Sequence, residues 1–284
     1  MEKRLLGRTG EALSVVGFGG IVVMRETPES AARLVARAVE RGINYFDVAP
    51  SYGNGEAEER LGPALEPYRN SVFLACKTGK RDREGAWAEL QQSLKRLRTD
   101  HFDLYQLHAV SKPEEVAQIL APGGALEAFV QAREQGLVRY LGFSAHSEEA
   151  AVALMDAFDF ASVLFPCNWV CWHQGKFGPR IVEKAQEKGV GRLALKALAK
   201  RPWAEGETRK WPKCWYSPVD TYEEAVLALR FTLSLPITAA VSPSHAEFLW
   251  WACDAADQFR PLSPEEMQEV ARRSEAIAPI FPHA

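Results

Sequence analysis

Short apolar runs alternate along the chain with segments in which apolar residues recur every three or four positions. Continuous apolar runs are typical of parallel strands buried on both faces, whereas the 3–4 spacing is typical of amphipathic helices. The apolar runs predict strands at 13–20, 43–48, 71–77, 102–108, 138–144, 161–166, 191–198 and 237–242. The spaced segments predict helices at 28–42, 56–65, 84–98, 123–136, 147–157, 178–188, 220–233, 244–257 and 264–277.

Eight strand–helix units therefore follow one another along the chain. Such an alternation is typical of an α/β protein with a closed (β/α)8 TIM barrel, and it fits an open sheet less well. The 284 residues contain no linker, low-complexity segment or shift in composition. We expect one barrel domain over 1–284, with the helix at 264–277 as an extra C-terminal helix.

The composition limits the kinds of partner that the protein can have. Apolar residues make up 47% and charged residues 25%, the profile of a globular protein with a sizeable core. The net charge is −3 and the basic residues are scattered, so we expect neither a nucleic-acid partner nor a membrane partner. No apolar run is long enough to span a bilayer, and the start, MEKRLLGRTGEALS, has no hydrophobic signal core. These features predict a cytoplasmic protein.

The chain has five cysteines, an odd number that is typical of free thiols in a protein that is not secreted. Cys167 and Cys171 in CNWVC have a spacing close to that of metal ligands. A structural zinc site usually needs four ligands in close pairs, and no second pair stands nearby. We therefore expect no metal and interpret both cysteines as core residues.

Chemically active side chains follow three consecutive predicted strands. Asp47 ends the strand at 43–48, Tyr52 lies in the next loop, and Lys77 and His108 end the two strands after it. Each has a plain structural interpretation: a turn residue, a surface aromatic, a solvated lysine and a core histidine. Because the carboxyl ends of barrel strands meet at the face that holds active sites, the four together predict one catalytic site.

These four residue types complement one another. A phenol has a pKa of about 10, too high for easy proton exchange near neutrality, and a nearby ammonium lowers it. A carboxylate beside the lysine keeps that ammonium charged and in place. A histidine opposite can donate a hydrogen bond to a substrate oxygen. Such a group is suited to protonating an oxyanion.

The sequence resembles the aldo-keto reductase superfamily over nearly its whole length. The segment RLLGRTGEALSVVGFGG is similar to the N-terminal β-hairpin and first strand of that family, and GINYFDVAPSYGNGEAEERLG is similar to its most diagnostic signature. SVFLACKTG, DLYQLH, VRYLGFS and LRFTLSLP match in order. The resemblance implies reduction of a carbonyl compound by hydride transfer from a nicotinamide cofactor.

The resemblance also implies a role for each residue of the predicted site. Tyr52 would be the general acid in reduction and the base in oxidation, with its pKa lowered by Lys77. Asp47 would pair with Lys77 and hold it, and His108 would orient and polarise the carbonyl group. The substrate would be a small aldehyde or ketone.

The cofactor would lie across the barrel mouth without a Rossmann fingerprint, so GFGG at 17–20 is not interpreted as a dinucleotide loop. The resemblance implies cofactor contacts at Gly19, Gly20, Asp47, Ser144, Asn168, Lys196, Ser242, Ser244 and Glu247. Lys200 and Arg201 are further candidate phosphate partners, or else part of a solvated loop. The sequence departs from the family at Ala145 and Leu164, where an Asn and a Gln usually hold the nicotinamide amide.

NADP is the usual cofactor in this family, and a basic residue after the eighth strand often binds its 2′-phosphate. Here VSPSHAEFLWWACDAA has none, and Glu247 would suit a 2′-hydroxyl, so NAD is the alternative. Two loops rich in tryptophan, at 168–179 and 200–218, either cover a flat apolar substrate or simply pack onto the barrel.

Two other functions stay open at this point. The first is a nicotinamide-binding sensor or partner subunit with little turnover, which the altered amide contacts would permit. The second is a different barrel enzyme, such as an isomerase or hydrolase, although no paired carboxylates or metal ligands at the strand ends support it. The sequence leaves the oligomeric state and the physiological substrate open.

Overall fold

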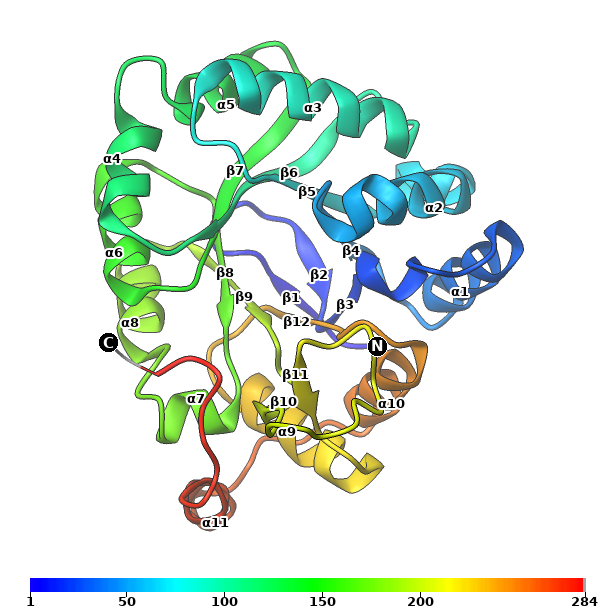
Figure 1. Cartoon of the computed structure of the whole chain (residues 1–284), viewed down its shortest axis with the longest axis vertical. Helices are drawn as coiled ribbons and strands as arrows, with labels where there is room; N and C mark the ends of the chain where they lie inside the picture. Colours follow the sequence, from blue (N-terminus) through cyan, green and yellow to red (C-terminus); the bar gives the residue numbers. More distant parts are fainter. Residues whose placement is uncertain (283–284) are drawn as a thin grey trace.

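The computed structural model describes residues 1–282 and contains a closed barrel of eight parallel strands ringed by helices (Figure 1). The strands pair in the order β12-β3-β4-β5-β6-β7-β8-β9, and β9 pairs with β12 to close the ring. The predicted (β/α)8 barrel is therefore confirmed. The barrel strands are β3 Val16–Gly19, β4 Tyr45–Asp47, β5 Phe73–Thr78, β6 Phe102–Val110, β7 Val138–Ala145, β8 Ser162–Pro166, β9 Gly191–Leu195 and β12 Ala239–Val241.

The helices around the barrel lie close to the predicted ranges, and the extra helix after the eighth unit is present as α11. Their bounds are α1 Pro28–Glu40, α2 Glu56–Leu65, α3 Arg83–Leu97, α4 Pro113–Leu120, α5 Ala125–Glu134, α6 Glu148–Ala157, α7 Trp169–His173, α8 Pro179–Glu187, α9 Tyr222–Ser234, α10 Ala246–Asp257 and α11 Pro264–Ser274. Short 3-10 helices lie at η1 Gly20–Val23, η2 Tyr52–Gly55 and η3 Glu66–Ser71.

The first and seventh predicted strands are shorter in the structure. Residues 12–14 form β2, which pairs antiparallel with β1 (Lys3–Leu5), so the barrel strand β3 begins only at Val16. The strand predicted at 191–198 ends at Leu195, because Lys196 has a left-handed backbone with φ of 62° that breaks the extended chain.

Three elements at the barrel mouth were not predicted. They are α4, α7 and a hairpin of β10 (Ala199–Pro202) and β11 (Tyr216–Pro218). The sequence interpretation assigned one helix to each strand, whereas α4 and α7 are short additions that precede the main helices α5 and α8. The strands β10 and β11 are short and lie on either side of a long polar loop, so their alternation gives no clear period.

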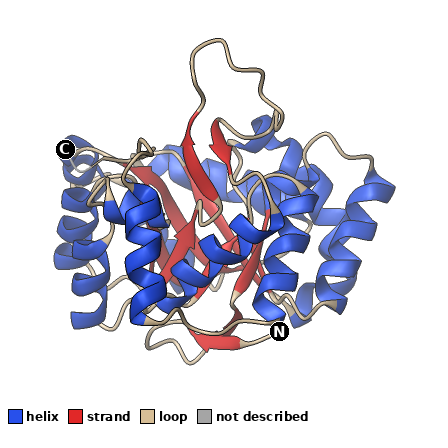
Figure 2. Ribbon diagram, turned by 90° about the horizontal axis from the view of Figure 1, so that it is seen from below, coloured by secondary structure: helices blue, strands red, loops and turns tan. Residues whose placement is uncertain are grey.

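The inside of the barrel has its own apolar core, distinct from the layer between strands and helices. It consists of Leu6, Leu13, Tyr45, Phe73, Ala75, Leu104, Leu164, Leu193, Ala239 and Val241. Leu6 and Leu13 come from the N-terminal hairpin, which covers one end of the barrel (Figure 2). That end is therefore closed, and the opposite end, where the strands finish, is the end available for a site.

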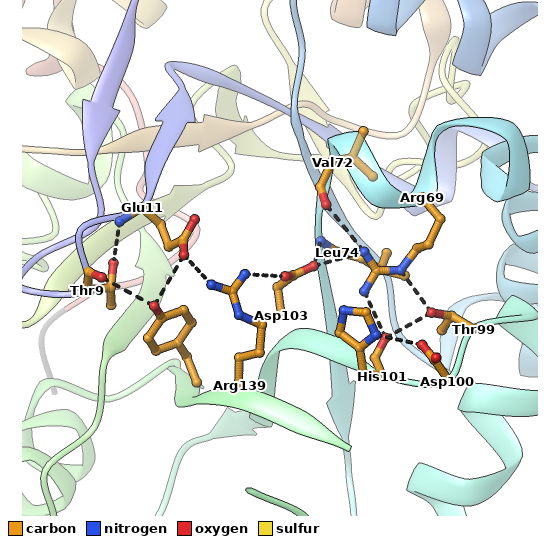
Figure 3. Close-up of polar contacts among 11 residues, drawn as sticks. Thr9, Glu11, Arg69, Val72, Leu74, Thr99, Asp100, His101, Asp103 and Arg139 are labelled. Atoms are coloured by element: carbon orange, nitrogen blue, oxygen red, sulfur yellow. Dashed lines mark hydrogen bonds and ion pairs between the residues drawn. The ribbon is translucent and has the colours of Figure 1, made fainter. Parts of the chain in front are cut away.

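A buried carboxylate holds charged groups together at the closed end of the barrel (Figure 3). Asp103 on β6 forms ion pairs with Arg69 at 3.1 Å and with Arg139 at 2.8 Å. Its Oδ2 also accepts a hydrogen bond from the Leu74 backbone N–H at 2.9 Å. Arg139 continues to Glu11 in the hairpin, so this network joins the hairpin to β5, β6 and β7. Its position at the closed end indicates a role in stability.

Asp103→Asn is expected to lower the free energy of unfolding by about 3 kcal/mol, because the largely buried Arg69 guanidinium loses its charged partner. The measurement is equilibrium unfolding in urea. Glu11→Gln is a matched control from the same network, and since its carboxylate is partly exposed it should cost at most about 1 kcal/mol. Equal losses in the two variants would contradict a special contribution of the buried carboxylate.

The remaining expectations about the fold concern cysteines, metals and membranes. All five cysteines are buried and unbonded to one another. Within residues 1–282, no group of three or more His, Cys, Asp or Glu side chains is arranged to hold a metal ion. Over the same residues, no helix is both long and apolar enough to cross a membrane.

Candidate active site

The loop after β4 turns sharply just past Tyr52. Gly53, Asn54 and Gly55 have φ of 63°, 53° and 97°, in the left-handed region that glycine adopts without steric cost. A side chain at Gly55 would also collide with Arg96, because a Cβ there would lie 2.5 Å from the guanidinium. The two glycines thus let the chain reverse after Tyr52 and enter α2, which leaves the phenol at the barrel mouth.

Asp47, Lys77 and Tyr52 are in contact at the ends of β4 and β5. Asp47 pairs with Ala75 in the sheet, so Lys77 lies two residues further along the neighbouring strand, on the same side. The buried Lys77 Nζ forms an ion pair with Asp47 Oδ1 and donates to the Val48 carbonyl oxygen at 3.2 Å. It also lies 3.3 Å from the Tyr52 hydroxyl oxygen. The structure therefore brings together three of the four predicted residues through one ammonium.

Two further residues fix the Asp47 carboxylate and were not found in the sequence. Gln106 Nε2 donates to Asp47 Oδ2 at 3.0 Å, and the Tyr45 hydroxyl donates to the same oxygen at 3.3 Å. Tyr45 stands two positions before Asp47, and Gln106 two positions before His108. The two-residue period of a strand, which places such pairs on one face, is the signal that would have found them.

The pKa values of Lys77 and Tyr52 are both raised, but by different causes. Burial lowers the pKa of Lys77, but the Asp47 carboxylate and the phenol together outweigh it, so the pKa lies above its ordinary 10.5. For Tyr52, burial raises the pKa above 10.0, and the opposing effect of Lys77 is smaller. The expectation that Lys77 lowers the pKa is right for its contribution and wrong for the net shift. The phenol is consequently protonated near neutral pH.

His108 points into the mouth because β6 is irregular there. The pairing of β6 with β7 shifts between Leu107 and Val110, and Ala109 has a left-handed backbone with φ of 55°. Irregularities of this kind re-aim side chains next to active sites. The Ala109 N–H donates to Ser144 Oγ at 2.7 Å, so the Ser144 hydroxyl holds this part of β6 in place.

The His108 ring is neutral and placed for hydrogen bonding. Burial, with smaller effects from the surrounding cations, lowers its pKa well below 6.5. Nδ1 lies 3.4 Å from the Ser51 hydroxyl, and a hydroxyl that donates to Nδ1 leaves the ring hydrogen on Nε2. The ring centroid is 5.8 Å from that of Tyr52, with the planes nearly perpendicular. A phenol and an imidazole N–H can thus converge on one substrate oxygen.

A cavity of about 320 Å³ opens beside these residues. Asp47, Tyr52 and His108 line it, and Lys77 lies just behind Tyr52. Of the residues predicted to contact a cofactor, those that line the cavity besides Asp47 are Gly19, Lys196, Ser242 and Ser244. A larger groove of about 550 Å³ between α4 and α5 is open and contains none of the predicted site residues.

The other predicted cofactor residues have different surroundings. Gly20 packs against Val48, where a Cβ would lie 2.7 Å from the valine side chain. Asn168 caps α7 by accepting from the Cys171 N–H at 2.9 Å, and its Nδ2 donates to the Lys196 carbonyl oxygen at 3.2 Å. Glu247 is exposed in the first turn of α10. Ser144, as described above, bonds to β6.

Gly19 and the basic residues after β9 also have clear structural roles. A Cβ at Gly19 would lie 2.4 Å from the Ser242 carbonyl oxygen, so only glycine permits β3 and the chain after β12 to approach this closely. The Gly19 N–H donates to Ser242 Oγ at 3.0 Å. Lys200 and Arg201 lie in β10 rather than in a loop, and they pair with Glu224 at 2.6 Å and with Glu207 at 2.7 Å.

The loop between β10 and β11 supplies a cation that the sequence interpretation missed. Lys213 lines the cavity next to Ser244, and its ammonium donates to the Val22 carbonyl oxygen at 3.1 Å and pairs with Glu26 at 3.3 Å. The adjacent Cys214 lies with its sulfur 3.0 Å from Ser244 Oγ. The loop thus reaches from the hairpin of β10 and β11 to η1 and to the segment before α10, and sequence periodicity does not reveal these contacts.

Some aromatic residues of the two loops line the cavity and others pack onto the barrel. Trp215 and Tyr216 line the cavity, and Trp215 is 55% exposed at its mouth. Trp169 and Phe177 are buried and pack their loop onto the barrel. The C-terminal tail also reaches the mouth, where the Phe281 ring lies 4.7 Å from that of His146; Figure 1 shows the red tail running back from α11 past α7.

Comparison with known proteins shows which family the chain belongs to. Residues 15–214 match the model of the aldo/keto reductase family. The chain belongs to this family. Among curated family relatives, L-galactose dehydrogenase of Arabidopsis thaliana is 31% identical over 228 residues, which cover 74% of this chain and 70% of that protein.

Other known proteins match over part or nearly all of the chain. The uncharacterised oxidoreductase YqkF of Bacillus subtilis (strain 168) is 34% identical over 156 residues, 51% of this chain and 49% of that protein. The chain thus spans about half the length of such curated relatives. The holo form of aldo-keto reductase AKR11C1 from Bacillus halodurans superposes with a TM-score of 0.77 at 25% identity, covering 99% of this chain and 98% of that one.

Proposed function

We propose that this protein is a cytoplasmic NAD(P)H-dependent reductase that converts an aldehyde or ketone into an alcohol. The observation that carries the proposal is the contact of Tyr52 with a buried, carboxylate-held Lys77, 3.3 Å away, in the wall of a cavity shared with His108. Proton donation to an oxyanion needs a donor that is protonated in the resting enzyme, and burial keeps the Tyr52 phenol in that form.

In this mechanism the carbonyl oxygen lies between Tyr52 and His108. The neutral imidazole donates from Nε2 and draws electron density from the carbonyl carbon. As negative charge develops on the oxygen, the phenol transfers its proton, and the Lys77 ammonium stabilises the phenolate that forms. Asp47, held by Gln106 and Tyr45, keeps that ammonium in place.

A nicotinamide cofactor fits the side of the cavity formed at the ends of β3 and β12. The hydroxyls of Ser242 and Ser244 and the backbone at Gly19 line that side, and Lys213 provides a positive charge there. These residues would hold the dinucleotide, with Gly20, Ser144, Asn168 and Glu247 as further candidates. When bound, the reduced nicotinamide supplies the hydride. Ala145 and Leu164 have no amide side chain to bind the carboxamide of the nicotinamide. The protein would therefore hold the nicotinamide mainly through its ring and ribose.

We propose NADPH as the cofactor, with NADH also accepted. A 2′-phosphate gains most from an unpaired guanidinium, whereas the cation available at this end of the cavity is Lys213, already bonded to Glu26. Fluorescence titration should therefore show that NADPH binds less than about tenfold more tightly than NADH. Lys213→Met should remove that advantage. A clear preference of the wild-type protein for NADH would overturn the choice of NADPH.

The proposed activity is tested by following oxidation of either reduced cofactor in the presence of small aldehydes, ketones and quinones. Turnover with at least one carbonyl compound is the expected result. The second candidate function is a cofactor-binding sensor or partner subunit, favoured by the apolar Ala145 and Leu164. Tight binding of cofactor without turnover of any carbonyl compound would support that candidate and overturn the reductase.

A further inference from the structure

A second lysine ammonium projects into the same cavity. Lys196 Nζ lies 3.2 Å from His146 Nε2, 5.2 Å from the Phe281 ring centroid and 5.7 Å from that of Trp215. Lys196 and His146 line the cavity together with Tyr52 and His108. The charge of Lys196 also contributes to the lowered pKa of His108, which places this lysine near the catalytic end.

The charge of Lys196 has no acidic partner within residues 1–282. Lys77 pairs with Asp47 and Lys213 with Glu26, but no carboxylate oxygen in that part of the chain lies within 4.0 Å of Lys196 Nζ. Burial lowers the pKa of Lys196 to about 7 and that of His146 to about 3. His146 is therefore neutral and does not compensate an ammonium. With a pKa of about 7 and no carboxylate partner within residues 1–282, Lys196 is only partly charged at neutral pH, and a bound anion would favour its ammonium form.

The backbone holds Lys196 in this position at a cost. Its φ of 62° lies in the left-handed region, which costs a residue other than glycine about 1 kcal/mol or more. Asn168 Nδ2 donates to the Lys196 carbonyl oxygen at 3.2 Å and stabilises this conformation. Strain of this kind persists where the surrounding structure imposes it, and it is concentrated at functional sites. Here it directs a long cationic side chain toward the cavity.

We propose that Lys196 and His146 form a subsite for the carboxylate of the substrate, so that the enzyme prefers carbonyl compounds carrying an acid group next to a flat apolar body. This inference rests on the proposed carbonyl reduction. The family resemblance implies instead that Lys196 contacts the cofactor, whose phosphates are also anions. The contacts of its ammonium are with His146, Phe281 and Trp215, although β9 pairs with β12, whose end carries Ser242. The aromatic rings suit the flat body, and the ammonium suits the carboxylate.

Binding of a simple aryl carboxylate tests the subsite without any turnover. Isothermal titration without cofactor should show that the wild-type protein binds benzoate more tightly than benzamide, its neutral analogue, by about tenfold. Lys196→Met should weaken benzoate binding by about tenfold and leave benzamide binding unchanged. Lys200→Met is the matched control, since this lysine lies on the same segment but pairs with Glu224, and it should leave benzoate binding unchanged.

Cofactor binding and turnover separate this inference from its alternatives. NADPH affinity should change less than about twofold in Lys196→Met. Weakened NADPH binding with unchanged benzoate binding would assign Lys196 to the phosphates and overturn the inference. Turnover gives a second test. In Lys196→Met, kcat/KM for 4-carboxybenzaldehyde should fall while kcat/KM for 4-methylbenzaldehyde stays constant, and equal losses for the two substrates would also overturn the inference. Lys196→Gln is a second neutral variant if Lys196→Met does not fold. If no carbonyl compound reacted, the reductase proposal would be wrong. The benzoate measurement would still test whether Lys196 binds a carboxylate, because it needs no turnover.

Discussion

Tyr52→Phe is expected to lower kcat for carbonyl reduction by about 10²- to 10⁴-fold, because the variant loses the group that donates a proton to the developing oxyanion. The benzene ring of phenylalanine fills nearly the same space as that of tyrosine, so the fold should be unchanged. The lost hydroxyl leaves the Lys77 ammonium paired with Asp47 and bonded to the Val48 carbonyl oxygen. Cofactor affinity, measured by fluorescence titration, should therefore stay within about twofold of the wild type.

Steady-state kinetics with the best carbonyl substrate gives the comparison. Tyr140→Phe is the control, since its hydroxyl bonds to the Thr9 carbonyl oxygen at 3.2 Å at the closed end of the barrel. That variant should keep its turnover number per folded molecule. A Tyr52→Phe variant that turns over at the wild-type rate would show that the phenol is not the acid.

Lys77→Met is expected to reduce both activity and stability. Activity should fall by about 100-fold or more, because no ammonium remains to stabilise the phenolate of Tyr52. The free energy of unfolding should fall by about 3–5 kcal/mol, since the buried Asp47 carboxylate is left without its counter-charge. Urea unfolding and steady-state kinetics measure the two effects separately.

A double variant separates these two effects of Lys77. Asp47→Asn combined with Lys77→Met removes both buried charges, so most of the lost stability should return. The amide can still accept hydrogen bonds from Gln106 and Tyr45. Activity should stay as low as in Lys77→Met, because the phenolate still has no cation beside it. If activity returned together with stability, Lys77 would act only by holding the fold.

The barrel could be predicted from the sequence because parallel strands that are buried on both faces appear as continuous apolar runs. The same alternation showed which residues stand at the strand ends, and the closed barrel brings Asp47, Lys77 and His108 to one mouth. Tyr45 and Gln106 were missed because they read as ordinary strand residues, although each stands two positions before a site residue. The hairpin of β10 and β11 was missed because its strands are short and its loop is polar.

The roles of the other residues around the cavity were harder to predict, because their contacts depend on segments that are far apart in the sequence and meet only in the folded chain. Ser144 was expected at the nicotinamide, and its hydroxyl bonds to the irregular part of β6 that aims His108. Lys213 comes from a long loop and reaches the opposite side of the mouth. The left-handed backbone of Lys196 is invisible in the sequence, and it is what directs this side chain toward His146.

Transfer of a label from the cofactor to the product tests carbonyl reduction most directly. The wild-type protein would be incubated with reduced nicotinamide cofactor deuterated at C4, on the face that is transferred, and with a reactive aldehyde, and the product would be examined by mass spectrometry. The proposed function predicts an alcohol with one deuterium on the carbinol carbon, formed in proportion to cofactor oxidised. Cofactor oxidation without alcohol, or an alcohol without deuterium, would contradict it.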